Sequence, residues 1–239
     1  MSINNALLQV TGLNAHYGKS HVLRGVTFSL GRGEVLSLLG RNGSGRSTTL
    51  KALMGLVPPS SGSIELNGKQ LAGAQPHTIC RAGLAFVPEE REVFANLTVE
   101  ENLRMGEQPA VAGAVHWTMA QMFDYFPRLK ERRRTLAGSL SGGEQQMLTM
   151  CRSLLGNPLA ILIDEPTEGL APKIVQQVAE CIQDMQRRGV SVLLVEQKLA
   201  IALKVSSRVC VMGHGHIVFE GSPEQLQADQ AMQQQWLAV

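Results

Sequence analysis

The chain has 239 residues, of which 44% are hydrophobic, 18% charged and only 4% aromatic, and its formal net charge is +2. A chain of this length can bury a large aliphatic core as one domain, or as one domain with an inserted lobe, without disulfides or structural metals. The small net charge gives no indication of nucleic-acid binding. No run approaches the ~18 apolar residues of a membrane span, so any membrane role is expected to come through a partner.

Short strands separated by glycine-containing turns are predicted in the first third of the chain. These strands cover residues 7–13, 21–30, 34–40 and 62–68. Later apolar runs end in polar or acidic residues, as buried parallel strands do, and they cover residues 83–89, 159–166 and 191–197.

Two helix starts carry the pattern of a capping box, in which a hydroxyl and a carboxylate three residues apart each accept a backbone N–H. They are Thr98 with Glu101 and Ser141 with Glu144. A third helix is predicted over residues 172–189, because its apolar residues share one face, arginines occupy its last turn and a glycine follows. That face carries Ile174, Val178, Ile182 and Met185.

Taken together, these elements predict an α/β core formed by residues 1–90 and 157–239, with a helical lobe inserted at about 91–156. The glutamine-rich tail is predicted to form a solvated helix. Its packing residues are expected to be Leu226, Met232, Trp236 and Leu237.

The segment GRNGSGRST has the spacing of a phosphate-binding loop, G-x-x-x-x-G-K-[ST], with arginine in place of lysine. It follows a predicted strand and precedes a predicted helix, which is the context that such a loop requires. Its glycines let backbone N–H groups surround phosphate oxygens, the helix N-terminus adds positive charge, and Ser47 offers a hydroxyl to Mg²⁺. The predicted nucleotide-binding residues are Gly40, Arg41, Asn42, Gly43, Ser44, Gly45, Arg46, Ser47 and Thr48.

Arg46 keeps the charge of the usual lysine but changes its shape. A guanidinium is planar and wide, and it prefers to bind two oxygens at once. It can therefore hold the β- and γ-phosphates. Whether it also supports the transition state is a separate question, which leaves open a site that binds nucleotide without turning it over.

Two carboxylates, Asp164 and Glu165, end the apolar run at 159–166. The first can reach the shell of a Mg²⁺ ion, usually through water, and the second can polarise an attacking water molecule. Taken alone, a pair of acids at a strand end is equally well explained as a structural cap. Downstream of a phosphate loop, the catalytic interpretation is favoured.

The segment LSGGE resembles the signature motif of ABC transporter ATPases, with a glycine-rich helix start that an anionic oxygen can approach closely. It comprises Leu140, Ser141, Gly142, Gly143 and Glu144. The resemblance extends over the whole chain, because all three motifs occur in the family's order. It implies a P-loop ATPase fold with an N-terminal antiparallel β subdomain and an inserted helical subdomain. It also implies a head-to-tail dimer in which this signature acts in trans on the partner's ATP.

Other family positions can be assigned by this resemblance. Tyr17 matches the aromatic residue that stacks on adenine, although alone it is equally well explained as a strand-end tyrosine. Glu89 occupies the place of the Q-loop glutamine, which couples Mg²⁺ and the γ-phosphate to the membrane subunit. Gln197 occupies the place of the switch histidine, and residues 166–172 occupy the D-loop.

One branch of the family is matched more closely, namely the ATPases of importers for branched-chain amino acids and related amides or urea. The matching stretches are VPE, VEQ, GLAP, LTVEENL (97–103), YFPRLKERR (125–133) and the ending WLAV. Arg46 and Glu90 depart even from this branch, which usually has lysine and glycine there. Gln197 can donate a hydrogen bond but cannot take up a proton, so any work as a general base falls on Glu165.

The resemblance therefore implies an ATP- and Mg²⁺-dependent ATPase at the cytoplasmic face of the bacterial inner membrane. Its partners would be permease subunits, a second ATPase protomer and, indirectly, a solute-binding protein. The alternative is a nucleotide-gated subunit that hydrolyses poorly while its partner turns over. A third possibility, an ABC protein without a permease, is less favoured because such proteins often carry tandem cassettes or long linkers.

Several features are interpreted as structural. The basic run at 128–135 is expected to be a solvated helical face, with acidic lipid or a partner as the next possibility. His214 and His216 are expected to flank a hairpin turn. The first ten residues lack the pattern of a signal peptide. The methionines at helical spacing (119, 122, 147 and 150) and the cysteines at 80, 151, 181 and 210 are expected in the core, the cysteines as free thiols.

Overall fold

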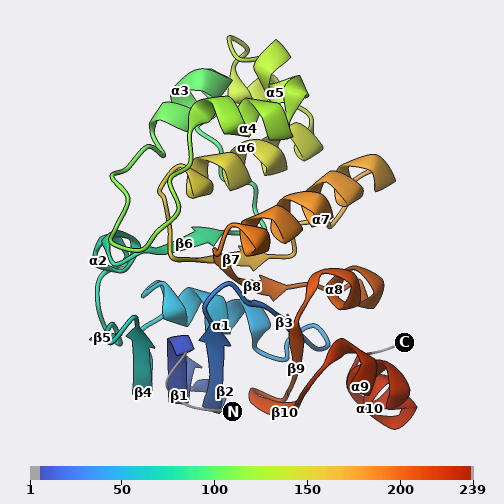
Figure 1. Cartoon of the computed structure of the whole chain (residues 1–239). Helices are drawn as coiled ribbons and strands as arrows, with labels where there is room; N and C mark the ends of the chain where they lie inside the picture. Colours follow the sequence, from blue (N-terminus) through green and yellow to red (C-terminus); the bar gives the residue numbers. More distant parts are fainter. Residues whose placement is uncertain (1–5, 238–239) are drawn as a thin grey trace.

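The computed structural model describes residues 6–237, and its strands form two sheets (Figure 1). The predictions about residues 1–5 of the opening and about 238–239 of the WLAV ending lie outside these residues. Within the described part, no helix combines the length and the hydropathy that a membrane span requires.

The smaller sheet is antiparallel and has the order β2-β1-β4-β5. Its strands are β1 (Ala6–Tyr17), β2 (Ser20–Gly31), β4 (Pro59–Leu66) and β5 (Lys69–Gln70). Strands β1 and β2 form a hairpin whose pairing runs from Ala6 opposite Gly31 to Tyr17 opposite Ser20. Tyr17 therefore lies at the turn of this hairpin, where half of the residue is exposed (50%).

The larger sheet has the order β10-β9-β3-β8-β7-β6. Its strands are β3 (Val35–Leu39), β6 (Leu84–Val87), β7 (Ala160–Asp164), β8 (Ser191–Val195), β9 (Arg208–Gly213) and β10 (His216–Gly221). All neighbours pair in parallel except β10, which forms an antiparallel hairpin with β9 across the turn at His214 and Gly215. Because parallel strands present their carboxyl ends at one edge, the segments that follow β3, β6, β7 and β8 converge there.

The helices lie on both faces of the larger sheet and at its ends. They are α1 (Arg46–Leu53), α2 (Pro76–Arg81), α3 (Val99–Arg104), α4 (Met119–Tyr125), α5 (Pro127–Glu131), α6 (Gly142–Leu154), α7 (Pro172–Arg187), α8 (Leu199–Val205), α9 (Pro223–Ala228) and α10 (Gln230–Trp236). Helices α3 to α6 follow β6 and precede β7, and they gather at the top of Figure 1, away from the smaller sheet. This arrangement confirms the predicted fold class, while the bounds 91–156 of the lobe stay a prediction.

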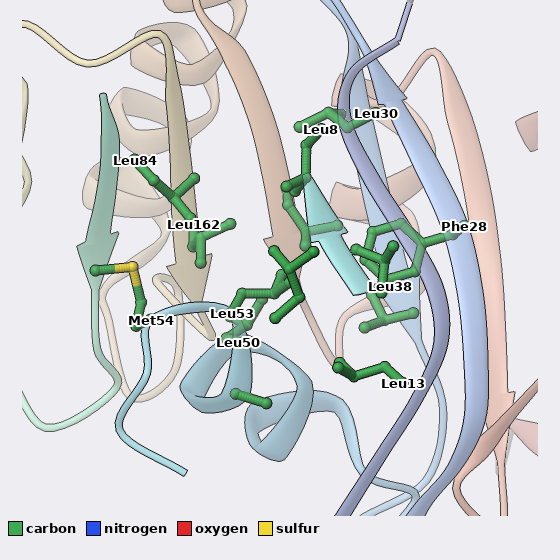
Figure 2. Packing of buried hydrophobic residues seen from close by; sticks show 14 of the residues in the cluster. Leu8, Leu13, Phe28, Leu30, Leu38, Leu50, Leu53, Met54, Leu84 and Leu162 are labelled. Atoms are coloured by element: carbon green, nitrogen blue, oxygen red, sulfur yellow. The ribbon is translucent and has the colours of Figure 1, made fainter. Parts of the chain in front are cut away.

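The main core lies between the two sheets and encloses α1 (Figure 2). Leu8 and Leu30 come from the hairpin of the smaller sheet, Leu38 from β3, and Leu50 and Leu53 from α1, and all five are fully buried. Complete burial of a leucine side chain contributes about 1.5–3 kcal/mol. Helix α1 is thus fixed by its apolar residues, and this fixes the loop that enters it.

A second core joins the helical lobe to the opposite face of the larger sheet. It includes Trp117 and Met122 of the lobe, Leu148 of α6 and Ile161 of β7. At its edge, the guanidinium of Arg188 lies 4.8 Å from the centre of the Trp117 ring. Helix α6 therefore belongs to a core shared by both parts.

Both predicted capping boxes are present, at Thr98 with Glu101 and at Ser141 with Glu144. The predicted apolar face of α7 is mostly confirmed, because three of its four residues are buried and Ile174 is partly buried. The hairpin turn at His214 is also confirmed. Of the four methionines predicted to be core residues, three are buried and Met119 packs against the second core.

Three structural predictions were wrong in part. Cys80 is exposed, because it lies on the outer side of the short helix α2, whereas the other three cysteines are buried. The tail forms two helices rather than one, since the side chain of Asp229 accepts the N–H of Met232 and starts a new helix. The basic run leaves α5 after Glu131, and Arg132 then pairs with Glu144 at 3.0 Å.

Arg208 connects the start of β9 to the turn before β3. Its Nε and Nη2 donate to the two carboxylate oxygens of Glu34 at 2.8 and 3.0 Å, and both side chains are largely buried. We expect Arg208→Met to lower the free energy of unfolding by about 2 kcal/mol, because the carboxylate then loses its cation. Urea denaturation without nucleotide measures this. Arg104→Met removes an exposed pair and should cost less than about 0.5 kcal/mol; equal losses would contradict the prediction.

Candidate functional site

A cavity of about 230 Å³ lies at the carboxyl edge of the larger sheet. Its lining consists of residues 42–48, Glu89, Glu165 and Gln197. These residues follow β3, β6, β7 and β8 in the chain, so the parallel topology brings together four segments that are distant in the sequence.

The phosphate loop (residues 40–48) is held in a fixed shape by its glycines and by the β9–β10 hairpin. Gly40 has φ 149°, and a Cβ there would lie 2.5 Å from the carbonyl oxygen of Met212. Gly45 has φ 108°, a conformation that residues with a side chain rarely adopt, and a Cβ there would lie 3.0 Å from a methyl group of Leu23. The backbone N–H of Gly215 donates to the carbonyl of Ser44 at 3.0 Å. Substitution at either glycine would therefore reshape the loop.

One buried hydroxyl in this loop has no partner among the described residues. The Oγ of Ser44 is buried and makes no hydrogen bond there. A buried polar group without a partner is costly, so such an atom often marks the position of a ligand. Its place in a glycine-rich loop at the start of α1 fits an anionic phosphate oxygen as the missing partner.

Arg46 does not point into solvent. Its guanidinium Nη1 donates to the backbone carbonyl of Glu196 at 3.2 Å, and Nη2 donates to Asn42 Oδ1 at 3.2 Å and to Glu165 Oε1 at 3.0 Å. Both side chains of the Arg46–Glu165 pair are almost fully buried, at 5% and 6% exposure.

Glu165 is held from two sides. Arg46 contacts one carboxylate oxygen, and Gln197 Nε2 donates to the other at 2.6 Å. The backbone of Glu165 is left-handed, with φ 44°, which is uncommon for a residue with a side chain and typical of functional positions. Burial and a hydrogen bond with Glu168 raise the pKa of Glu165, while Gln197 and Arg46 oppose this rise.

Asp164 and Ser47 form the second polar contact of the site. Ser47 Oγ donates to Asp164 Oδ1 at 3.2 Å, and burial raises the pKa of Asp164 to about 6. Carboxylate oxygens of Glu89, Glu165 and Glu168 lie within 4.8 Å of one another. Carboxylate and hydroxyl oxygens are the ligands that Mg²⁺ prefers, and the site offers both kinds, with Ser47 in contact with Asp164 and with Glu89 grouped with Glu165 and Glu168.

Several residues predicted for the site do not line this cavity, namely Gly40, Arg41, Asp164, Tyr17 and the segment Leu140–Glu144. Arg41 turns away and donates to the carbonyl of Gln234 in α10 at 2.9 Å. Tyr17 lies at its hairpin turn. The segment Leu140–Glu144 forms the start of α6, where Ser141 caps the helix and Glu144 pairs with Arg132. Tyr17 and the start of α6 are therefore separate from the lining of the cavity in this chain.

Two residues around the site were missed by the sequence analysis. Glu196 is buried and accepts hydrogen bonds from Thr167 Oγ1 at 2.8 Å and from the N–H of Gln197 at 2.9 Å. Arg91 has φ 41° and donates to the carbonyl of Glu168 at 3.0 Å, and it lies directly against Gly142. An acid after a buried strand could have indicated Glu196, whereas no local pattern indicates Arg91.

Comparison with known proteins places the chain among transporter components. Residues 23–168 match the family profile described as ABC transporter. The chain is 44% identical over 212 residues to the high-affinity branched-chain amino acid transport ATP-binding protein BraG of Pseudomonas aeruginosa, covering 89% of this chain and 91% of that protein. It is 35% identical to a probable branched-chain amino acid transport ATP-binding protein, LivF, of Archaeoglobus fulgidus, with 92% and 94% coverage.

An export component is also similar, at lower identity. The lipopolysaccharide export system ATP-binding protein LptB of Haemophilus influenzae is 30% identical, with 97% of each chain covered. Among solved structures, an ATP-binding subunit of an ABC transporter has a TM-score of 0.79 at 31% identity, covering 95% of this chain and 94% of the other. A nucleotide-free ATP-binding cassette has a TM-score of 0.82 at 23% identity, with 95% and 96% coverage, which supports the fold alone.

Proposed function

This chain belongs to the ABC transporter family, as an ATP-binding subunit whose hydrolysis of ATP is coupled to transport, and we propose that it serves an importer of branched-chain amino acids or related small amides. The observation that carries the proposal is the order of similarity. The two relatives named for branched-chain amino acid transport are 44% and 35% identical and one named for histidine transport is 35% identical, whereas the export proteins for lipopolysaccharide and Nod factor are 30% and 32% identical.

In the proposed site, the phosphate loop binds the nucleotide's phosphates. Backbone N–H groups of residues 42–48, the partnerless Ser44 hydroxyl and the Arg46 guanidinium supply donors and positive charge. Ser47, Asp164 and Glu89 would hold Mg²⁺, which supplies charge neutralisation between the phosphates when bound. Tyr17, exposed at the hairpin turn, would stack on the base.

The proposed reaction is in-line attack of water on the γ-phosphate. Glu165 would orient that water and accept its proton, and Gln197 would fix the carboxylate through its 2.6 Å hydrogen bond. The start of α6 at Leu140–Glu144 would act on the nucleotide of a second protomer, since it does not line the cavity of its own chain. Positioning and charge stabilisation would provide most of the rate.

We propose membrane permease subunits and a second ATPase protomer as direct partners, a solute-binding protein as an indirect one, and the cytoplasmic face of the membrane as the location. Proteoliposomes that contain this chain with its permeases test the direction and the solute. We expect ATP added on the side of this subunit to drive uptake of a branched-chain amino acid. Efflux under the same conditions would overturn the importer assignment and leave the ATPase assignment intact.

A poorly hydrolysing subunit is the second candidate, and the contact between Arg46 and Glu165 favours it. An arginine that forms an ion pair with the Glu165 carboxylate could keep this carboxylate from serving as a base. Phosphate release by the purified chain, measured beside nucleotide binding, decides between the two. Turnover by the wild type supports the enzyme. If the wild type binds nucleotide without turnover, and Arg46→Lys restores turnover, the second candidate is supported.

Gln197→His should raise turnover several-fold, because an imidazole can both donate to Glu165 and take up a proton near neutral pH. The measurement is phosphate release at saturating ATP over pH 6–8. Gln197→Ala is the matched control, which removes the donor and should lower turnover. A histidine variant that binds ATP normally but works more slowly would contradict this prediction.

A further inference from the structure

Arg46 is bound to the chain's own carboxylate in the place where a phosphate-loop cation would hold nucleotide. The Nη2 of Arg46 lies 3.0 Å from Glu165 Oε1, and both side chains are almost fully buried. In this structure the cation that the proposed function assigns to phosphate therefore already has an anionic partner.

From this geometry we infer that Arg46 is a cation shared between two anions: it holds Glu165 while the site is empty and passes to the phosphates when nucleotide binds, which releases Glu165 for its work as a base. The inference rests on the proposed function. It assigns to Arg46 a positioning role toward Glu165 that a lysine at this position would not provide.

The fork of the arginine side chain makes this sharing possible. One nitrogen, Nη1, is anchored on the carbonyl of Glu196 at 3.2 Å, while the other, Nη2, reaches both Asn42 and Glu165. A lysine has a single nitrogen at its tip, so its donors cannot occupy the two separate positions that Nη1 and Nη2 hold here. The three contacts together select one orientation of the guanidinium, directed at Glu165.

The contacts of Glu165 also allow it to separate from Arg46. Its second oxygen accepts the Nε2 of Gln197 at 2.6 Å, so the carboxylate keeps a polar partner after Arg46 leaves. Loss of the arginine from an otherwise unpartnered buried carboxylate would be costly, and the Gln197 contact reduces that cost. Nucleotide must nevertheless break a buried ion pair before it gains Arg46, so the pair opposes nucleotide binding.

Nucleotide affinity in a double-mutant cycle tests this opposition, because affinity is measured without turnover. Titrations use a fluorescent ADP with Mg²⁺ on four chains: wild type, Glu165→Gln, Arg46→Lys and the double variant. Neutralising Glu165 should tighten binding about tenfold in the arginine chain and less than about threefold in the lysine chain. Glu168→Gln is the neighbouring-charge control, since Glu168 is exposed beside Glu165, although it also hydrogen-bonds Glu165, and is not among the partners of Arg46. It should change affinity less than about twofold in either chain.

The outcomes are distinct. Two outcomes would overturn the shared-cation role: equal tightening in the arginine and lysine chains, or tightening by Glu168→Gln as large as that by Glu165→Gln. Either one would mean that the substitution removed only general repulsion between carboxylate and phosphate. Failure of the wild-type chain to bind fluorescent ADP or ATP at millimolar concentration would instead overturn the proposed nucleotide site itself. Tightening confined to the arginine chain supports the inference.

Discussion

We expect Glu165→Gln to lower the rate of ATP hydrolysis by at least about a hundredfold, while the variant still binds ATP. General-base catalysis contributes roughly 10²–10⁴-fold, and an amide cannot accept the proton of an attacking water. The amide still fits the site, because its oxygen can accept a hydrogen bond from either Arg46 or Gln197, the two donors that hold the carboxylate now. The substitution therefore removes proton uptake with little change in shape.

Two measurements check this result. Phosphate release at saturating MgATP reports the rate, and urea denaturation reports whether the variant is folded. Glu168→Gln removes a charge from the same acidic cluster but should keep turnover within about threefold, because that side chain is exposed. If the glutamine variant at 165 retained more than about a third of wild-type turnover, the base would have to be another group.

The local features of this fold could be predicted because they depend on neighbouring residues. The helix expected directly after the phosphate loop and the capping box at Ser141 depend on residues a few positions apart, and both are present. The apolar face of α7 follows from helical periodicity alone. The break between the two tail helices is also a local feature, because the Asp229 side chain accepts the N–H of Met232 three residues later. The glutamine-rich composition around Asp229 obscured this helix start.

The partners of Arg46 could not be predicted in this way. Glu165 is 119 residues away in the sequence and the carbonyl of Glu196 is 150 residues away, and only the order of β3, β8 and β7 in the sheet brings them together. From the sequence, Arg46 and Glu165 are expected in one site with separate roles. Their contact depends on the reach of a guanidinium across two strand ends, which no spacing encodes.

Arg91 is a second case of this kind. Its contact with Gly142 and with the carbonyl of Glu168 joins the segment after β6 to the start of α6 and to the segment after β7. A guanidinium can approach Gly142 so closely only because that residue has no side chain. The glycine was predicted for its openness to an anion, and in this structure the same openness admits a cation of the chain itself.

Gly142→Ala should abolish at least about 99% of turnover without preventing nucleotide binding by the same chain. A Cβ at this position would overlap Arg91, whose flexible tip can move, so the fold tolerates the methyl group. A partner's phosphate would meet that methyl group instead of open helix N–H groups, and loss of one such transition-state contact costs roughly 10²–10³-fold. Urea denaturation should give a stability equal to or above that of the wild type, because alanine favours helix more than glycine does.

Mixing two inactive variants then tests whether α6 acts across a dimer. A pair formed by one Gly142→Ala chain and one Glu165→Gln chain has a single intact composite site: the base of the first chain facing the helix start of the second. An equal mixture should recover about a quarter of wild-type turnover, since half of the dimers are mixed and each holds one working site of two. A helix start that served the nucleotide of its own chain would leave every pair with two defective sites, and the mixture would stay as inactive as its parts.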